Sequence, residues 1–170
     1  MTPDSLPRSP DLLTEPSWRP SPRAKTFWTV QTALGWLFVL AVLLGWFALD
    51  DGRRPWQIAA LLIAVPVAVA ATIAVPRWRY RVHRWEVTEE AVYSRVGWLT
   101  QESRVAPISR VQTVDTERGP LERLFGLSTI TVTTASSAGA VRIELLDGSV
   151  ADRTVARLTE VAARHRGDAT

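Results

Sequence analysis

Two stretches near the start of the chain are apolar almost throughout. The first covers residues 27–49 and the second covers residues 56–75, and neither contains a charged side chain. A helix needs about 20 apolar residues to cross the hydrocarbon core of a bilayer, which is about 30 Å thick. The link over residues 50–55 is so short that the two helices must be antiparallel neighbours. We therefore predict a transmembrane hairpin over residues 27–75.

Proline and tryptophan residues suggest where the hairpin bends and where it ends. Pro66 lies inside the second stretch and is expected to kink it, whereas Pro76 is expected to end it. Tryptophans are enriched at both surfaces of a membrane, because the ring is apolar and its N–H is polar. Four of them fit this pattern, Trp28 and Trp78 at one surface and Trp46 and Trp56 at the other.

The basic residues predict how the hairpin is oriented. The link holds Arg53 and Arg54 beside two aspartates, whereas the outer flanks are richer in positive charge. Loops with more Lys and Arg stay in the cytoplasm, so both termini are predicted to be cytoplasmic. Lys25 is the only lysine, and this arginine bias indicates a GC-rich, bacterial coding sequence and a bacterial inner membrane. The flanking basic residues are Arg8, Arg19, Arg23 and Lys25 on one side, and Arg77, Arg79, Arg81 and Arg84 on the other.

The first 26 residues differ in composition from the rest. They are polar and contain six prolines, which is typical of a disordered or polyproline-like segment. We predict a disordered tail over residues 1–26. The pairs Ser9-Pro10 and Ser21-Pro22 leave docking of a partner open as an alternative to a purely solvated tail.

Beyond residue 77 the apolar residues recur every second position, which predicts β-strands. The alternation starts at residues 77–83, and the run over 129–134 is β-branched throughout. The period then changes to three and four over residues 150–166, which predicts one amphipathic helix. The result is an α+β domain over residues 77–166, with several antiparallel strands and a C-terminal helix. Its predicted core contains Ile108, Val111, Ile130, Val132, Val141, Ile143, Val155 and Leu158.

Several short blocks in this region occur in a specific order. They are Val96-Gly97-Trp98-Leu99, Val105-Ala106-Pro107-Ile108, Gly119-Pro120-Leu121 and Leu124-Phe125-Gly126-Leu127. Together with the hairpin in front, they resemble the bacterial pleckstrin-homology-like membrane proteins of the YdbS type over roughly residues 28–165. The resemblance implies a PH-like, seven-stranded, strongly bent antiparallel sheet or barrel capped by a C-terminal helix. The chain departs from it at residues 136–140 and in the N-terminal tail. The resemblance implies a fold far more than a function.

Few residues offer catalytic or metal chemistry. The chain has no cysteine, which excludes disulfides, zinc–thiolate sites and thiol nucleophiles. His83 and His165 belong to no metal motif, and His83 is expected at the surface among the neighbouring arginines. Asp115 and Glu117 share one side of an extended run, a spacing too common in strands to indicate catalysis. We expect no enzyme activity, cofactor or metal site.

The juxtamembrane arginines are the first candidate binding residues. Anionic headgroups attract each basic residue near the membrane surface by about 1 kcal/mol. The alternative is that these residues only set the topology, and both roles are compatible. The candidate headgroup contacts are Arg77, Arg79, Arg81 and Arg84.

A short predicted helix over residues 120–125 is the second candidate. Pro120 suits its first turn and Gly126 suits the position just after its end. Leu121, Leu124 and Phe125 form an apolar patch that either plugs the domain core or meets a partner subunit or the lipid interface.

Two classes of function fit these features. The favoured one is a membrane-anchored cytoplasmic module that binds a protein partner or self-associates, and the alternative is binding of anionic lipid headgroups. Nucleic-acid binding is not expected, because residues 77–170 carry fourteen arginines against twelve acidic residues.

Overall fold

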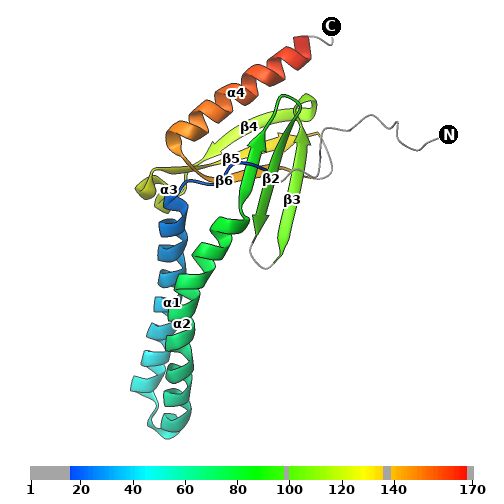
Figure 1. The fold of residues 1–170 in the computed structure, drawn as a ribbon. Helices are drawn as coiled ribbons and strands as arrows, with labels where there is room; N and C mark the ends of the chain where they lie inside the picture. Colours follow the sequence, from blue (N-terminus) through cyan, green and yellow to red (C-terminus); the bar gives the residue numbers. More distant parts are fainter. Residues whose placement is uncertain (1–15, 98–99, 136–138, 168–170) are drawn as a thin grey trace, which may run out of the picture.

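The computed structural model describes residues 16–97, 100–135 and 139–167. Two long helices project from one side of a β-rich domain, and a further helix covers the opposite side (Figure 1). The projecting helices are α1 (Arg23–Leu49) and α2 (Arg54–Val82), joined by the short helix η1 (Asp51–Arg53). Both are long and apolar enough to cross a membrane. The predicted hairpin of two long apolar helices is confirmed.

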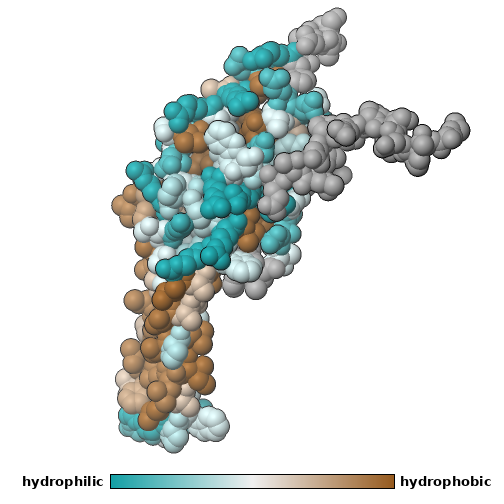
Figure 2. Space-filling view, in the orientation of Figure 1, coloured by the Kyte–Doolittle hydropathy of each residue, from teal (hydrophilic) through white to brown (hydrophobic). Residues whose placement is uncertain are grey.

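The outer surface of the hairpin is apolar, as lipid contact requires. Figure 2 shows a hydrophobic stalk that ends in a hydrophilic tip at the link. Phe38 and Leu62 are 72% and 70% exposed, so large apolar side chains point away from the helix pair. At the tip, the Gln57 side-chain amide donates hydrogen bonds to the backbone carbonyls of Trp46 and Asp50, at 3.1 and 2.7 Å. These bonds join the two helices where the chain reverses.

The second helix continues past Pro76, so the prediction that Pro76 ends it is wrong. Proline has no N–H, so Pro76 leaves the carbonyl group four residues earlier, that of Thr72, without its helical partner. The Arg77 guanidinium donates to the neighbouring carbonyl of Ile73 at 2.8 Å. The helix ends where the N–H of His83 donates to the carbonyl of Arg79. The strand predicted over residues 77–83 is therefore helical, and the first strand begins at Arg84.

The domain contains two three-stranded antiparallel sheets instead of a closed barrel. Within the described residues there are six strands, whereas the resemblance implies seven. The chain bends between the sheets at η2 (Ile108–Arg110). The first sheet has the order β1 (Arg84–Val87), β2 (Ala91–Gly97), β3 (Gln101–Pro107), and the second has the order β4 (Val111–Glu117), β5 (Leu127–Thr134), β6 (Val141–Asp147).

The helix α4 (Gly148–Gly167) packs over the sheets and completes the core. Its Leu158 is fully buried among side chains of both sheets, including Val92 of β2 and Ile143 of β6. All eight core residues predicted from the sequence lie in this cluster, with Val111 and Val155 at its partly buried edge. The predicted α+β architecture is confirmed.

Residues 16–22 form a strap along the domain, and the prediction of disorder is wrong for residues 16–26. Trp18 and Trp85 exchange backbone hydrogen bonds of 3.0 and 2.9 Å, which adds a short bridge to β1. The Ser21 N–H donates to the carbonyl of Leu145, and its buried hydroxyl donates to Asp147 at 2.9 Å. The strap then leads directly into α1. Residues 1–15, with the Ser9-Pro10 pair, lie outside the described residues.

Candidate binding surfaces

A buried tryptophan joins the hairpin to the domain. Trp28 of α1 is only 1% exposed, although the sequence placed it at the lipid surface. The Arg79 guanidinium lies 4.7 Å from its ring centroid, and the His83 ring lies 4.8 Å away. Trp78, which was predicted at the same surface, is 52% exposed. Trp28 therefore holds the base of α1 against the end of α2.

His83 is buried, contrary to the prediction that it lies at the surface. It is 2% exposed because it caps the end of α2 beneath Trp28 instead of alternating along a strand. Its Nδ1 lies 2.8 Å from the carbonyl oxygen of Arg79, and its Nε2 lies 3.5 Å from the carboxylate of Glu144 on β6. The ring thus ties the end of the transmembrane helix to the second sheet.

We call the contact of Trp28, Arg79, His83 and Glu144, where the hairpin meets the domain, the joint. Glu144, the acid in the joint, is held in its charged form. The hydrogen bond from His83, followed by the positive charges of His83, Arg79 and Arg142, lowers the pKa of Glu144 against the opposing effect of its burial. A carboxyl group with a lowered pKa stabilises the fold above its unfolded pKa, and this contribution is lost as pH falls through the folded pKa. The joint is therefore a pH-dependent contact.

We expect the Glu144→Gln variant to lose this contribution. Near neutral pH its melting temperature should be lower than that of the wild-type chain, because the amide cannot replace the charge. Below about pH 4.5, the ordinary value of this carboxyl, the two chains should converge as wild-type Glu144 becomes protonated. Thermal unfolding of the detergent-solubilised full chain between pH 3 and pH 7 measures the difference.

Glu102→Gln is the matched control, because Glu102 forms an exposed ion pair with Arg104 on β3. A wild-type advantage over Glu144→Gln that stayed constant down to the lowest pH would contradict the assignment.

The four candidate headgroup arginines do not form one cluster. Arg77 is engaged with the carbonyl of Ile73, and Arg79 lies over Trp28. Arg81 and Arg84 instead line a surface cavity beside the membrane end of the domain. In the helix Arg79 is turned away from Arg81, whereas Arg77 shares a face with Arg81 but is held at the carbonyl of Ile73.

The apolar patch on α3 (Pro120–Phe125) is also divided. Pro120 and Gly126 bound this helix as the sequence predicted. The Phe125 ring packs edge-on against Phe27 at the base of α1, with centroids 6.1 Å apart. Leu124 is 78% exposed, and Leu121 is half-buried. One side of the helix therefore supports the joint, and Leu124 remains at the surface.

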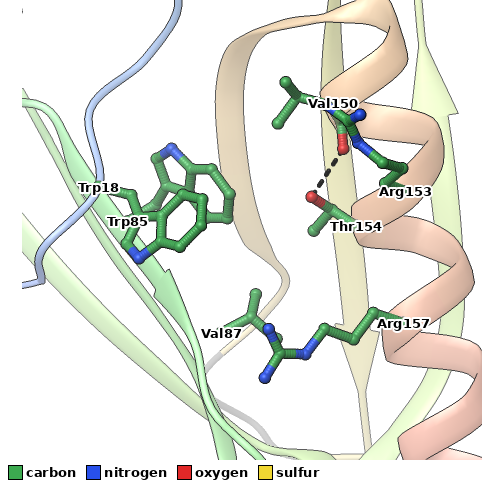
Figure 3. Close-up of a pocket in the computed structure, with 7 residues that line it drawn as sticks. All are labelled: Trp18, Trp85, Val87, Val150, Arg153, Thr154 and Arg157. Atoms are coloured by element: carbon green, nitrogen blue, oxygen red, sulfur yellow. Dashed lines mark hydrogen bonds between the residues drawn. The ribbon is translucent and has the colours of Figure 1, made fainter.

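A groove is lined by residues of the strap, β1 and α4 (Figure 3). The rings of Trp18 and Trp85 lie 5.4 Å apart at one wall, and Trp18 is 54% exposed. The groove encloses about 310 Å³. We call it the tryptophan groove, and its lining residues are Trp18, Trp85, Val87, Val150, Arg153, Thr154 and Arg157.

Two arginines give the tryptophan groove a positive edge. Arg153 and Arg157 are four residues apart on α4 and therefore share one helix face. Neither forms an ion pair with another described residue, whereas the neighbouring Asp152 pairs with Arg118. Sequence reasoning missed this groove because it treated Trp18 as part of a disordered tail. The four-residue spacing of the arginines was the available signal.

Among the described residues, no three histidine, aspartate or glutamate side chains come close enough together to hold a metal ion.

Comparison with known proteins identifies the family. Residues 32–162 match the family model described as "Bacterial PH domain". The chain is also 31% identical over 112 residues to UPF0699 transmembrane protein YdbS of Bacillus subtilis (strain 168), covering 63% of this chain and 69% of that protein. No solved structure matches. The family match covers the sheets, most of α4 and nearly all of the hairpin, so the chain belongs to the bacterial PH domain family as a transmembrane member.

Proposed function

We propose that this protein is a membrane-anchored binding module, without catalytic activity, that docks a protein segment in the tryptophan groove. The observation that supports this proposal is an apolar groove with an exposed tryptophan on one wall and two arginines on the other. Tryptophan and arginine are the residues that most often dominate binding energy at protein interfaces. One wall of the groove belongs to α4, which covers the side of the domain opposite the hairpin (Figure 1), so a partner can reach it from solution.

The chemistry of the groove specifies its occupant. Its apolar wall favours a bulky apolar side chain, because burial of such a chain is worth roughly 1.5–3 kcal/mol. Arg153 and Arg157 favour a carboxylate nearby, since arginine binds carboxylates through paired N–H donors. We therefore assign an acidic segment with one large apolar residue. Residues 11–15 of the chain itself, with two leucines between Asp11 and Glu15, carry this chemistry, so self-association is one form of the proposal.

Selection from a random peptide library on the detergent-solubilised full chain tests this function. We expect enrichment of acidic peptides that contain leucine, phenylalanine or tryptophan. Trp18→Ala should weaken binding of the enriched peptides about 30-fold, since a central tryptophan is typically worth about 2 kcal/mol or more. Reversing the charge with Arg153→Glu and Arg157→Glu should switch the preference to basic peptides.

Trp56→Ala is the matched control, because Trp56 is 72% exposed at the far end of the hairpin. Binding of a synthetic peptide of residues 1–15 would identify self-association. Peptides that bind the wild type and Trp18→Ala equally well would refute the groove as the docking site.

The proposal places both termini in the cytoplasm. This orientation is supported by the basic residues, which are more numerous in the two outer flanks of the hairpin than in the link. The two flanks lie on the same side because the helices are antiparallel. A fluorescent protein fused after Thr170 should be fluorescent, and alkaline phosphatase fused there should be inactive. The reverse result, an active phosphatase, would place the domain outside the cell membrane and remove cytoplasmic partners from consideration.

A further inference from the structure

The last turns of α2 and the adjoining ends of three strands enclose a second cavity, of about 260 Å³. Trp78, Arg81 and Val82 are spaced by three and four residues, so they present one face of the helix to it. The strands add Arg84 from β1, Arg95 from β2 and Gln101 from β3. This headgroup cavity is separate from the tryptophan groove and does not depend on it.

The headgroup cavity concentrates positive charge. Arg84 and Arg95 lie directly opposite each other in the β1–β2 pairing, an arrangement in which like charges destabilise a sheet. Arg81 adds a third guanidinium. Among the described residues, neither Arg81 nor Arg84 has an ion-pair partner. An anion between Arg81 and Arg84 would therefore supply the counter-charge that these two side chains lack among the described residues.

The acidic residues nearest in sequence are engaged elsewhere. Glu86 of β1 accepts hydrogen bonds from the N–H and hydroxyl of Ser17 in the strap. Glu102 of β3 pairs with Arg104. Among the described residues, those that line the cavity therefore include several donors and no carboxylate.

The height of the cavity matches the headgroup layer of the bilayer. The apolar stretch of α2 ends at Val75. At about 1.5 Å per residue, Trp78 lies roughly 4.5 Å and Arg81 roughly 9 Å beyond it along the helix. The headgroup layer is about 5–8 Å thick on each side, and arginine side chains reach several ångströms toward it. Trp78 is 52% exposed at this level, as expected for an interfacial tryptophan.

We propose that this cavity binds the phosphate of an anionic phospholipid. Arg81, Arg84 and Arg95 supply paired N–H donors for phosphate oxygens, and the Gln101 amide supplies a neutral donor. The acyl chains remain beside the apolar surface of α2, below Trp78. Arg77 and Arg79 take no part, because each is engaged within the hairpin and its joint.

Native mass spectrometry of the full chain in detergent tests the site, with phosphatidylglycerol and phosphatidylcholine as probes. The wild type should retain phosphatidylglycerol in preference to phosphatidylcholine. The variant Arg81→Gln/Arg84→Gln/Arg95→Gln should bind phosphatidylglycerol roughly 100-fold more weakly, from about 1 kcal/mol per arginine. The matched control Arg153→Gln/Arg157→Gln/Arg164→Gln removes the same charge from α4 and should bind like the wild type.

Two further measurements make the proposal falsifiable. Without anionic lipid, the cavity variant should melt at or above the wild-type temperature, because it loses like-charge repulsion; a large fall would show that the arginines are structural.

Inorganic phosphate at 10 mM should not displace phosphatidylglycerol, and displacement would show that the ligand is a soluble phosphate. Equal lipid loss in both triple variants would also overturn the site. Peptide binding in the tryptophan groove should survive in the cavity variant, so the two proposals fail independently.

Discussion

Replacing Trp28 with alanine is expected to lower the free energy of unfolding by about 3–5 kcal/mol, the usual cost of deleting a buried aromatic side chain. Trp28 is 1% exposed and contacts both Arg79 and His83, so its loss leaves a hole where the hairpin meets the domain. His83 would then face water, and its contact with Glu144 would weaken. Thermal unfolding of the detergent-solubilised full chain measures the loss.

Trypsin provides a second measurement, specific to the joint. Arg81 and Arg84 flank the end of α2, and loosening of the joint should make the chain there easier to cleave. Trp56→Ala is the control, because it deletes the same side chain where it is exposed. Trp28→Phe keeps a ring beneath Arg79 and should lose less stability than Trp28→Ala. Similar melting temperatures for Trp28→Ala and Trp56→Ala would mean that Trp28 does not hold the joint.

The hairpin and the core were predictable because each depends on local pattern. Two uncharged stretches of sufficient length can satisfy their backbone groups in lipid only as helices. The alternation over β6 identified Val141 and Ile143 as buried, and both are 2% exposed or less. Likewise, Pro120 and Gly126 bounded α3 correctly. In each case, neighbouring residues in the sequence decide the outcome.

The joint was not predictable from the same signals. Residues 77–83 alternate in polarity like a strand, yet residues 77–82 continue α2, and Trp28 covers the helix end. Trp78 is half-exposed beside the headgroup cavity, whereas Arg79 lies over Trp28 in the joint. The contact with Trp28, which is distant in the sequence, favours a helix over a strand for this segment.

Both candidate sites depend on residues brought together from distant parts of the chain. Trp18 reaches the tryptophan groove only because the strap pairs with β1. Arg95 and Gln101 reach the headgroup cavity only through the register of β1, β2 and β3. The sequence identified the arginines next to the membrane as one group, but only Arg81 and Arg84 of these four line the cavity.

Ile143→Asp is expected to unfold the domain while leaving the helices of the hairpin inserted. Ile143 is 1% exposed, and it lies opposite Ile130 in the β5–β6 pairing. A carboxylate there would have no partner within the apolar core, at a cost of several kcal/mol. Most small domains have only about 5–15 kcal/mol of stability to lose. Loss of the near-ultraviolet circular dichroism signal and faster tryptic digestion of residues 84–167 would report the unfolding.

The comparison with Val105→Asp isolates burial as the cause. Val105 lies on β3 and is 47% exposed, so the same charge remains in water and should change stability by about 0.5 kcal/mol or less. Ile143→Val removes one methylene group and should cost about 0.5–1.5 kcal/mol. A one-residue slip of β6 would turn Ile143 outward and bring Arg142 and Glu144 inward. An unchanged melting temperature for Ile143→Asp would therefore show that the strand has that slipped register. The observed pairing predicts that the loss of stability increases in the order Val105→Asp, Ile143→Val, Ile143→Asp.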